Sequence, residues 1–353
     1  MRAKKQLLSL CVGLALLPVA SLGVSEEDKP KKSTSIFAEM ENPELTALAK
    51  RKLDMTLFCA PIANDEIKQA VYADMREAKW DRFGMSCALQ YGGEIIEDDW
   101  LSAFAIEDKL NLLGDHITYF EVLDKQYNAH YQGGDLTIEL GWRWERNRIQ
   151  ALKLLDDVEM FEPLIPEITV LKAAYTLAST MRESDTREMM EASIKARGLL
   201  DGVVEDSPEV IDGLPLLMLA QLLLALPEFS GGDPIRAIEL LEQGMAIDPE
   251  NLSFHRWLIE GLVAERENAA AIDILRKAAD VPVEASHPQD YVDMAKVLGG
   301  IAVRLGEKDI AAHFSKNRQQ LLSKKPYLLA RKARASVGHG GANPITGELK
   351  NEI

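Results

Sequence analysis

Apolar residues recur at helical spacing along most of this chain. Leu45, Ala49, Leu53 and Leu57 stand four residues apart, and similar stripes continue into the last third of the sequence. Spacings of three and four residues place such side chains on one face of an α-helix. The run 135–144 alternates as a strand would, but no second strand is in sight to pair with it. The pattern therefore predicts an all-α protein.

Glycine and proline indicate where these helices begin and end. We expect breaks at Gly84, Gly92–Gly93, Gly114 and Gly133–Gly134. Residues 168–181 and 186–204 have the pattern of a helix pair, and Ser207-Pro208-Glu209 should open the next helix. In Gly231-Gly232-Asp233-Pro234 the glycines should end one helix, while the aspartate caps the following helix and the proline takes its first turn.

Two segments in the C-terminal half are similar to each other. Residues 237–249 match residues 271–283 in register. The positions that carry the match are Ala237, Leu241, Gly244 and Pro249 in the first copy and Ala271, Leu275 and Ala278 in the second. Small residues allow two helices to cross closely, leucine fills the space between them, and proline ends a helix. A single helix pair cannot bury its apolar face, so repeats of this kind stack on their neighbours.

These positions resemble the second-helix signature of the tetratricopeptide repeat (TPR). The helix expected between the two copies, 252–264, has apolar residues at two first-helix positions of the family, Leu258 and Leu262, whereas Ile259 stands where a small residue is usual. Residues 289–322 have the pattern of a further, degenerate pair. The resemblance implies an α-solenoid of TPR-like helix-turn-helix repeats over 206–323, preceded by an N-terminal helical region over 42–205.

The resemblance also implies a binding surface. In TPR proteins the first helix of each pair lines a concave groove that holds a peptide or a protein. Carried over to this chain, the groove residues are Ser253, Arg256 and Glu260, together with Gln221 and Asp293. Arg256 and Glu260 stand four residues apart, so they also suit an ion pair with each other. The expected function is a scaffold that binds a protein or peptide partner and performs no chemistry.

A second resemblance implies a different function. The turn Phe229-Ser-Gly-Gly-Asp-Pro234 precedes a repeat helix in a chain that reads as exported, and this combination is similar to the T component of TRAP transporters, a periplasmic helical-repeat protein. It implies an accessory ligand-binding component of a transporter. Such a component should contain an enclosed apolar pocket, whereas a scaffold should present an open groove.

The N-terminus has the layout of a secretory signal peptide. Arg2, Lys4 and Lys5 precede an apolar run from Leu7 to Leu22, and small residues follow it. The run is shorter than the ~20 residues of a membrane-spanning helix, although a retained membrane anchor is an alternative. We therefore expect a signal peptide over 1–25, a flexible leader over 26–41, and export, with a bacterial periplasm as the natural compartment.

Charge and cysteine content fit this setting. The chain contains 40 basic and 56 acidic residues, so its net charge of −16 repels nucleic acid and anionic membranes. In an oxidising compartment Cys59 and Cys87 are candidates for a disulfide, with two separate buried thiols as the alternative. Residues 324–353 form a basic, Gly-containing tail, which either docks on an acidic surface or is a solvated face.

Motifs for catalysis or cofactor binding are absent from the sequence. The histidines lack the spacing of a helical metal site, the cysteines lack C-x-x-C spacing, and the glycine-rich turns lack phosphate-binding frames. We therefore predict neither an enzyme nor a cofactor or metal. One aromatic and basic cluster, Trp142-Arg143-Trp144 with Arg146 and Arg148, could stack a ligand. The simpler interpretation is one indole in the core and arginines along a polar face.

Overall fold

The computed structural model describes residues 66–68, 85–86, 89–94, 105–129, 135–161, 164–180, 186–286 and 288–324. Every regular element in these ranges is helical, and none of them contains a strand. The protein is therefore all-α, as the apolar spacing predicts, and its helices follow one another in a solenoid-like order. The expected signal peptide, the leader, the cysteine pair and the tail beyond Lys324 lie outside the described residues.

The chain forms two compact units. Among the described residues, unit 1 contains 161, 164–177 and 187–324, and unit 2 contains those up to 160 together with 178–180 and 186.

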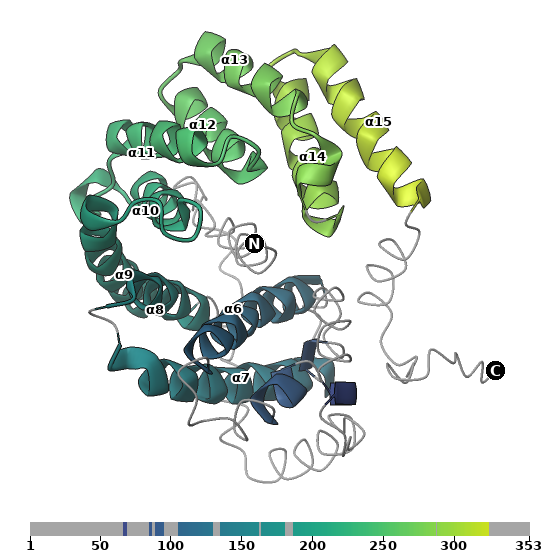
Figure 1. Ribbon diagram of the computed structural model, residues 1–353. Helices are drawn as coiled ribbons and strands as arrows, with labels where there is room; N and C mark the ends of the chain where they lie inside the picture. The colour runs from purple at the N-terminus through teal and green to yellow at the C-terminus, as the bar shows by residue number, and fades with distance from the viewer. Residues whose placement is uncertain are drawn as a thin grey trace, which may run out of the picture. The chain divides into compact units, whose positions relative to one another are not determined.

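Unit 2 is built around two long antiparallel helices, α6 (Ala105–Ala129) and α7 (Asp135–Glu159) (Figure 1). The antiparallel order follows from the contacts, since Phe120 packs on Trp144 with ring centroids 4.7 Å apart while Lys109 reaches Asp157 at 3.4 Å. Residues 135–144, whose alternation is compatible with a strand, form the first turns of α7. The helical spacing of apolar residues continues from this run into the buried face of α7. The described residues contain no strand with which this run could pair.

Three expected helix ends are wrong. Gly114 lies inside α6, and Gly92 and Gly93 lie inside a helical stretch over 89–94. A glycine within a helix costs only about 1 kcal/mol, which burial of the neighbouring residues outweighs. Residues 207–213 form a turn and not a helix start: Ile211 and Asp212 have positive φ angles of 49° and 53°, and the Ile211 side chain is buried.

Unit 1 is a series of helix pairs. In chain order its elements are α8 (Pro166–Thr180) up to residue 177, α9 (Thr186–Asp206) from residue 187, α10 (Leu214–Ala225), the 3-10 helix η3 (Glu228–Ser230), α11 (Pro234–Ile247), α12 (Leu252–Ala264), α13 (Asn268–Ala279), the 3-10 helix η4 (Val283–Ala285), α14 (Pro288–Arg304) and α15 (Lys308–Lys324). The helix pair expected near 168–204 is present as α8 and α9.

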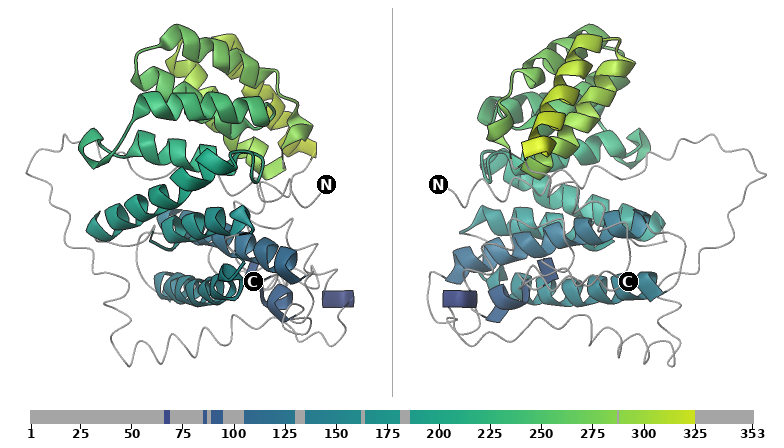
Figure 2. Two further views of the ribbon diagram at one scale, coloured as in Figure 1. Left: turned by 60° about the vertical axis from the view of Figure 1, so that its left-hand side comes forward. Right: turned by 90° about the vertical axis from the view of Figure 1, so that its right-hand side faces the viewer.

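The last six α-helices stack in two rows. Each helix of the pairs α10–α11, α12–α13 and α14–α15 contacts its partner, and α12 also contacts α10 and α14. In Figure 1, α10, α12 and α14 form the inner row of an arc, and α11, α13 and α15 form its outer row. Figure 2 shows the pairs as successive layers, from teal α10 to yellow α15.

The small residues of the repeat lie at close helix contacts. Ala237, Ala271 and Ala278 are completely buried or nearly so. At Gly244 of α11 an added Cβ would overlap the ring of Phe254, which belongs to α12. The sequence suggested that small residues separate the two helices of one pair. Gly244 instead makes room for the first helix of the next pair, so it joins neighbouring repeats.

Two of the turns between paired helices have the same geometry. Between α12 and α13, Glu267 N donates to Leu262 O at 2.8 Å and Arg266 has a φ of 65°. Between α14 and α15, Glu307 N donates to Ala302 O at 2.9 Å and Gly306 has a φ of 84°. This six-to-one hydrogen bond with a left-handed residue inside it is the Schellman motif that ends many helices. It supports a repeated helix-turn-helix unit extending to α15.

The turn from α10 to α11 is longer and is tied to α9. As expected, the Asp233 side chain caps α11 by accepting from Arg236 N at 3.0 Å. Arg197 of α9 donates to Gly231 O at 2.7 Å, and Asp201 accepts from the Arg236 guanidinium at 2.7 Å. An added Cβ at Gly232 would overlap the Leu226 carbonyl oxygen. Close packing at the glycines and capping by Asp233 therefore account for the Gly-Gly-Asp-Pro motif.

Candidate functional site

The predicted binding residues lie on the inner row of unit 1, mainly on α12. The Asn251 side chain caps this helix by accepting from Ser253 N at 3.0 Å. Phe254, Leu258 and Leu262 form the buried face of α12. Arg256 and Glu260 lie on a different face, so the helix presents one apolar and one polar side, as its sequence pattern implies.

Arg256 and Glu260 form an ion pair. Arg256 Nε donates to Glu260 Oε1 at 3.1 Å, and the Arg256 guanidinium carbon lies 4.7 Å from the centroid of the Trp257 ring. The Arg256 side chain is only 11% exposed and Glu260 31%. The two charges therefore neutralise each other, and a partner would meet a paired arginine held against an indole face.

The other predicted residues come from each helix of the inner row. Gln221 on α10 is 5% exposed and Ser253 on α12 is 4% exposed, so neither side chain is an open surface group. Asp293 on α14 is half-buried. The structure thus brings Arg256 and Glu260 together, and it places Gln221 and Asp293 on the helices that flank α12 in the inner row.

Two buried donors on the inner row have no acceptor in the described part of the chain. They are Gln221 Nε2 on α10 and Trp257 Nε1 on α12. Two further buried donors also have no acceptor among the described residues: Asn251 Nδ2 at the cap of α12 and Trp142 Nε1 in unit 2. A buried donor without an acceptor destabilises a protein by about 1–3 kcal/mol. Each of these donors is therefore a buried polar group without the hydrogen bond that burial normally requires.

Sequence reasoning missed Trp257. The residue stands between Arg256 and Leu258, both of which the repeat pattern singled out, and a lone tryptophan beside an arginine is the signal that could have found it. His255, next to it, is not a candidate for charge recognition. Its pKa is lowered mainly by burial, against the effect of a hydrogen bond with the Asn251 carbonyl, so the ring is neutral near pH 7.

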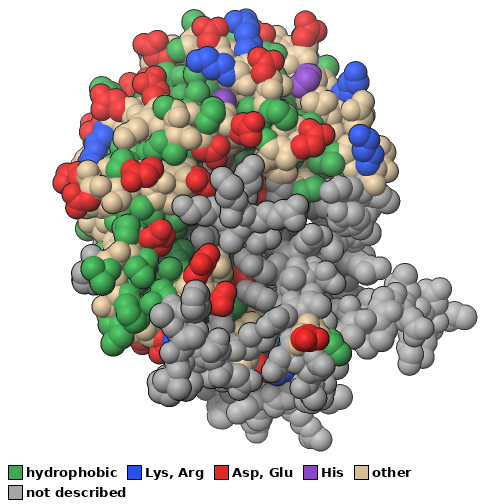
Figure 3. All heavy atoms as spheres, in the orientation of Figure 1, with side chains coloured by type: hydrophobic (Ala, Val, Ile, Leu, Met, Phe, Trp, Pro, Cys, Tyr) green, Lys and Arg blue, Asp and Glu red, His purple; other side chains and the backbone are tan. Residues whose placement is uncertain are grey.

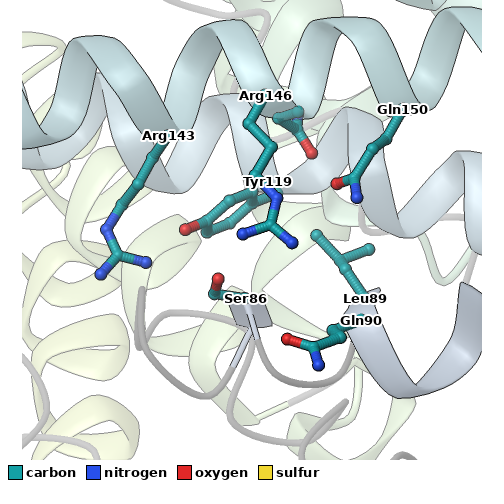
Figure 4. A pocket seen from close by; sticks show the side chains of 8 residues that line it. Ser86, Leu89, Gln90, Tyr119, Arg143, Arg146 and Gln150 are labelled. Carbon is teal, nitrogen blue, oxygen red and sulfur yellow. The ribbon is translucent and has the colours of Figure 1, made fainter. Parts of the chain in front are cut away.

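The aromatic and basic cluster of α7 is only partly as expected. Trp144 is in the core, and Arg148 is held by Glu145 at 2.6 Å, as a polar-face arginine would be. Arg143, however, is 2% exposed and is among the largest fully buried side chains. Arg143 and Arg146 both line a small cavity of unit 2 (Figure 4). Leu89 and Tyr119 line the same small cavity as Arg143, so segments distant in sequence lie around it.

The described ranges contain no cluster of three or more His, Cys, Asp or Glu side chains that could hold a metal ion. They also contain no helix whose length and apolar character would allow it to cross a membrane. On the face of unit 1 visible in Figure 3, acidic side chains are spread over the surface and basic ones are fewer.

Comparison with known proteins does not place the chain in a family. No protein-family model matches it, and no curated protein matches it either. The function is therefore argued from the helix arrangement and from the inner-row residues.

Proposed function

We propose that this chain is a non-enzymatic scaffold of the cell envelope that binds a protein or peptide partner on the inner row of α10, α12 and α14. The observation that carries the proposal is the pair of buried donors, Gln221 Nε2 and Trp257 Nε1, that have no acceptor in the described residues. A partner that supplies acceptors would remove their cost of about 1–3 kcal/mol each, and this gain would add to its affinity.

The chemistry of the face favours a polypeptide partner. A peptide backbone presents carbonyl acceptors at regular spacing, which suits donors on successive helices of a stacked row. The Trp257 side chain is partly exposed, although its Nε1 atom is buried. The acidic surface and the net charge of −16 favour a partner segment that is neutral or basic.

The remaining parts of the proposal rest on the sequence. The basic cluster, apolar run and small residues of 1–25 support export to a periplasm. The absence of catalytic motifs from the sequence supports a binding role and not an enzymatic one. The repeat positions, with the shared turn geometry at Arg266 and Gly306, support a TPR-like array.

An affinity capture with matched variants tests the proposal. The chain from residue 26 onward serves as bait in a cell-envelope extract, and captured proteins are identified by mass spectrometry. We expect one dominant protein, whose recovery falls about tenfold with Trp257→Phe, because phenylalanine keeps an aromatic ring and loses the donor. Arg276→Gln on the outer-row helix α13, where Arg276 pairs with Asp273 at 2.8 Å, is the control and should leave recovery unchanged.

Two outcomes would contradict the proposal. Equal loss with Trp257→Phe and Arg276→Gln would show that binding does not depend on the inner row. A small molecule that remains bound to the bait, with no protein partner, would favour the transporter-accessory alternative.

A further inference from the structure

Three large apolar side chains are exposed around the turn between α10 and α11. Phe229 on η3 is 89% exposed, Ile235 in the first turn of α11 is 66% exposed, and Ile194 on α9 is 54% exposed. Ile194 lies one helical turn before Arg197, whose Nη1 donates to Gly231 O, so α9 and the turn adjoin on this side. A single exposed apolar residue is ordinary, whereas several large ones on adjoining segments mark an interaction surface.

Backbone hydrogen bonds hold the turn that carries Phe229. Gly232 N donates to Pro227 O at 3.0 Å and closes the loop around the phenylalanine. Asp233 N donates to Leu223 O, also at 3.0 Å, and ties the end of the turn to the last part of α10. The ring is therefore exposed on a preformed turn, and a preformed surface loses less conformational entropy on binding than a flexible one.

The two arginines nearest the turn are engaged by the protein itself. Arg197 donates to Gly231 O at 2.7 Å and lies 3.6 Å from Asp201. Arg236 of α11 pairs with the same aspartate at 2.7 Å. Both guanidinium groups are thus held between α9 and the turn, where Asp201 offsets part of their charge.

The carboxylates beside the apolar side chains face the solvent instead. Glu228 directly precedes Phe229, and Glu239 lies one helical turn after Ile235; both carboxylates are on exposed residues. Lys195 on α9 is exposed as well and carries the opposite charge. On the face of unit 1 that Figure 3 draws, acidic side chains also prevail over basic ones. The surface therefore combines apolar side chains with an excess of negative charge.

We propose that Phe229, Ile194 and Ile235 form a docking surface for a protein segment in which apolar side chains are flanked by lysine or arginine. The apolar side chains of the segment cover the phenylalanine, and its basic side chains pair with the exposed carboxylates. An anionic membrane surface does not fit, because the same carboxylates are repelled by it. The docking surface contains none of the inner-row residues, so this inference goes beyond the proposed function and does not depend on it.

Binding of a defined peptide to the full chain tests the apolar part of the surface. The probe is a fluorophore-labelled peptide, Lys-Lys-Leu-Leu-Lys-Lys-Leu-Leu-Lys-Lys, and fluorescence anisotropy is followed at constant ionic strength. We expect saturable binding, with a dissociation constant about tenfold weaker for Phe229→Ala, because the leucines lose the apolar area that they cover. Val303→Ala is the control, since Val303 is 65% exposed on α14 and is not part of the surface.

A second pair of variants tests the charge. Glu228→Gln should weaken binding of the same peptide about threefold, because one exposed ion pair is lost. Glu265→Gln removes the same charge from an exposed residue after α12 and should leave binding unchanged. Trp257→Phe, the inner-row variant, should also leave it unchanged. The four replaced residues other than Trp257 are exposed, so their thermal midpoints of unfolding should stay close to that of the parent chain.

Several results would overturn the inference. They are no saturable binding of the lysine peptide, equal binding of a peptide with glutamate in place of lysine, equal weakening by Phe229→Ala and Val303→Ala, and weakening by Trp257→Phe as large as that by Phe229→Ala. Sedimentation of the chain with phosphatidylglycerol vesicles that is lost in Phe229→Ala would instead assign the surface to a membrane. Self-association of the chain that is lost in the same variant would assign it to a second copy.

Discussion

Gly244 allows α11 and α12 to approach each other. A Cβ at this position would overlap the Phe254 ring, which is completely buried. We expect Gly244→Ala to destabilise the protein by about 1–3 kcal/mol, because overpacking forces neighbouring groups out of their rotamers. Urea denaturation followed by circular dichroism measures the change.

Gly300 is the matched control for Gly244. It lies in α14 with no atom within 4 Å of an added Cβ. Gly300→Ala should therefore be neutral or stabilise the protein by about 0.5–1 kcal/mol through helix propensity. If Gly244→Ala proved as harmless as Gly300→Ala, the assigned contact between α11 and α12 would be wrong.

His116 should make unit 2 sensitive to acid. Its folded pKa of about 4 lies below the ordinary value of about 6.5, so the folded state prefers the neutral ring. The stability it contributes is complete above pH 6.5 and is lost as the pH falls toward 4, by roughly 2 kcal/mol at pH 5.

Urea midpoints at pH 7 and pH 5 measure this loss. In His116→Gln the difference between the two pH values should shrink, because glutamine does not titrate, while carboxylates that titrate in both proteins contribute equally. An unchanged difference would show that His116 is not the group responsible.

Predictions for individual residues were correct where the residues involved lie on a single helix. The four-residue spacing of Arg256 and Glu260 allowed their ion pair to be anticipated, and the periodicity of 237–249 identified its buried alanine and leucine. Arg143 was misplaced on a polar face because its surroundings include residues that are distant in sequence, such as Leu89 and Tyr119. The missing acceptors of Gln221 and Trp257 likewise depend on neighbouring helices.

At the scale of elements, the two Schellman turns have different residues at their left-handed position. Arg266 adopts a left-handed φ of 65°, which costs a residue with a Cβ roughly 1 kcal/mol, whereas Gly306 adopts 84° without strain. Arg266→Gly should therefore raise the free energy of unfolding by about 1 kcal/mol, and the midpoint of thermal unfolding with it.

Gly306→Ala tests the same argument in reverse. It should lower the free energy of unfolding by about 1 kcal/mol, since no atom lies within 4 Å of an added Cβ and only the backbone conformation opposes the change. If both substitutions were destabilising, contacts of the Arg266 side chain and not its backbone would dominate at that turn.

The ends of helices were predicted correctly where residues close to the end determine them. Residues 252–264 form α12 as expected, and Asp233 caps α11 as its position before Pro234 implies. The break expected at Gly114 failed because burial of the surrounding helix face outweighs the small cost of one glycine. The start expected at Pro208 failed because Ile211 is buried in a turn there.

At the scale of the whole molecule, the sequence pattern predicted an all-α, solenoid-like protein because helical periodicity survives even where repeat motifs are weak. It did not predict that the inner row would combine an internal ion pair with unsatisfied donors. The ion pair lies within α12, whereas the burial of the donors on α10 and α12 depends on how neighbouring helices pack. These residues are the basis of the proposed scaffold function.

Gln221→Met tests this central claim most directly, through the affinity of the captured partner measured by isothermal titration calorimetry. Methionine has a similar length and lacks the unsatisfied donor. We predict a dissociation constant about tenfold weaker, together with a thermal midpoint for the free chain that is unchanged or higher. An unchanged affinity would contradict partner binding at the inner row.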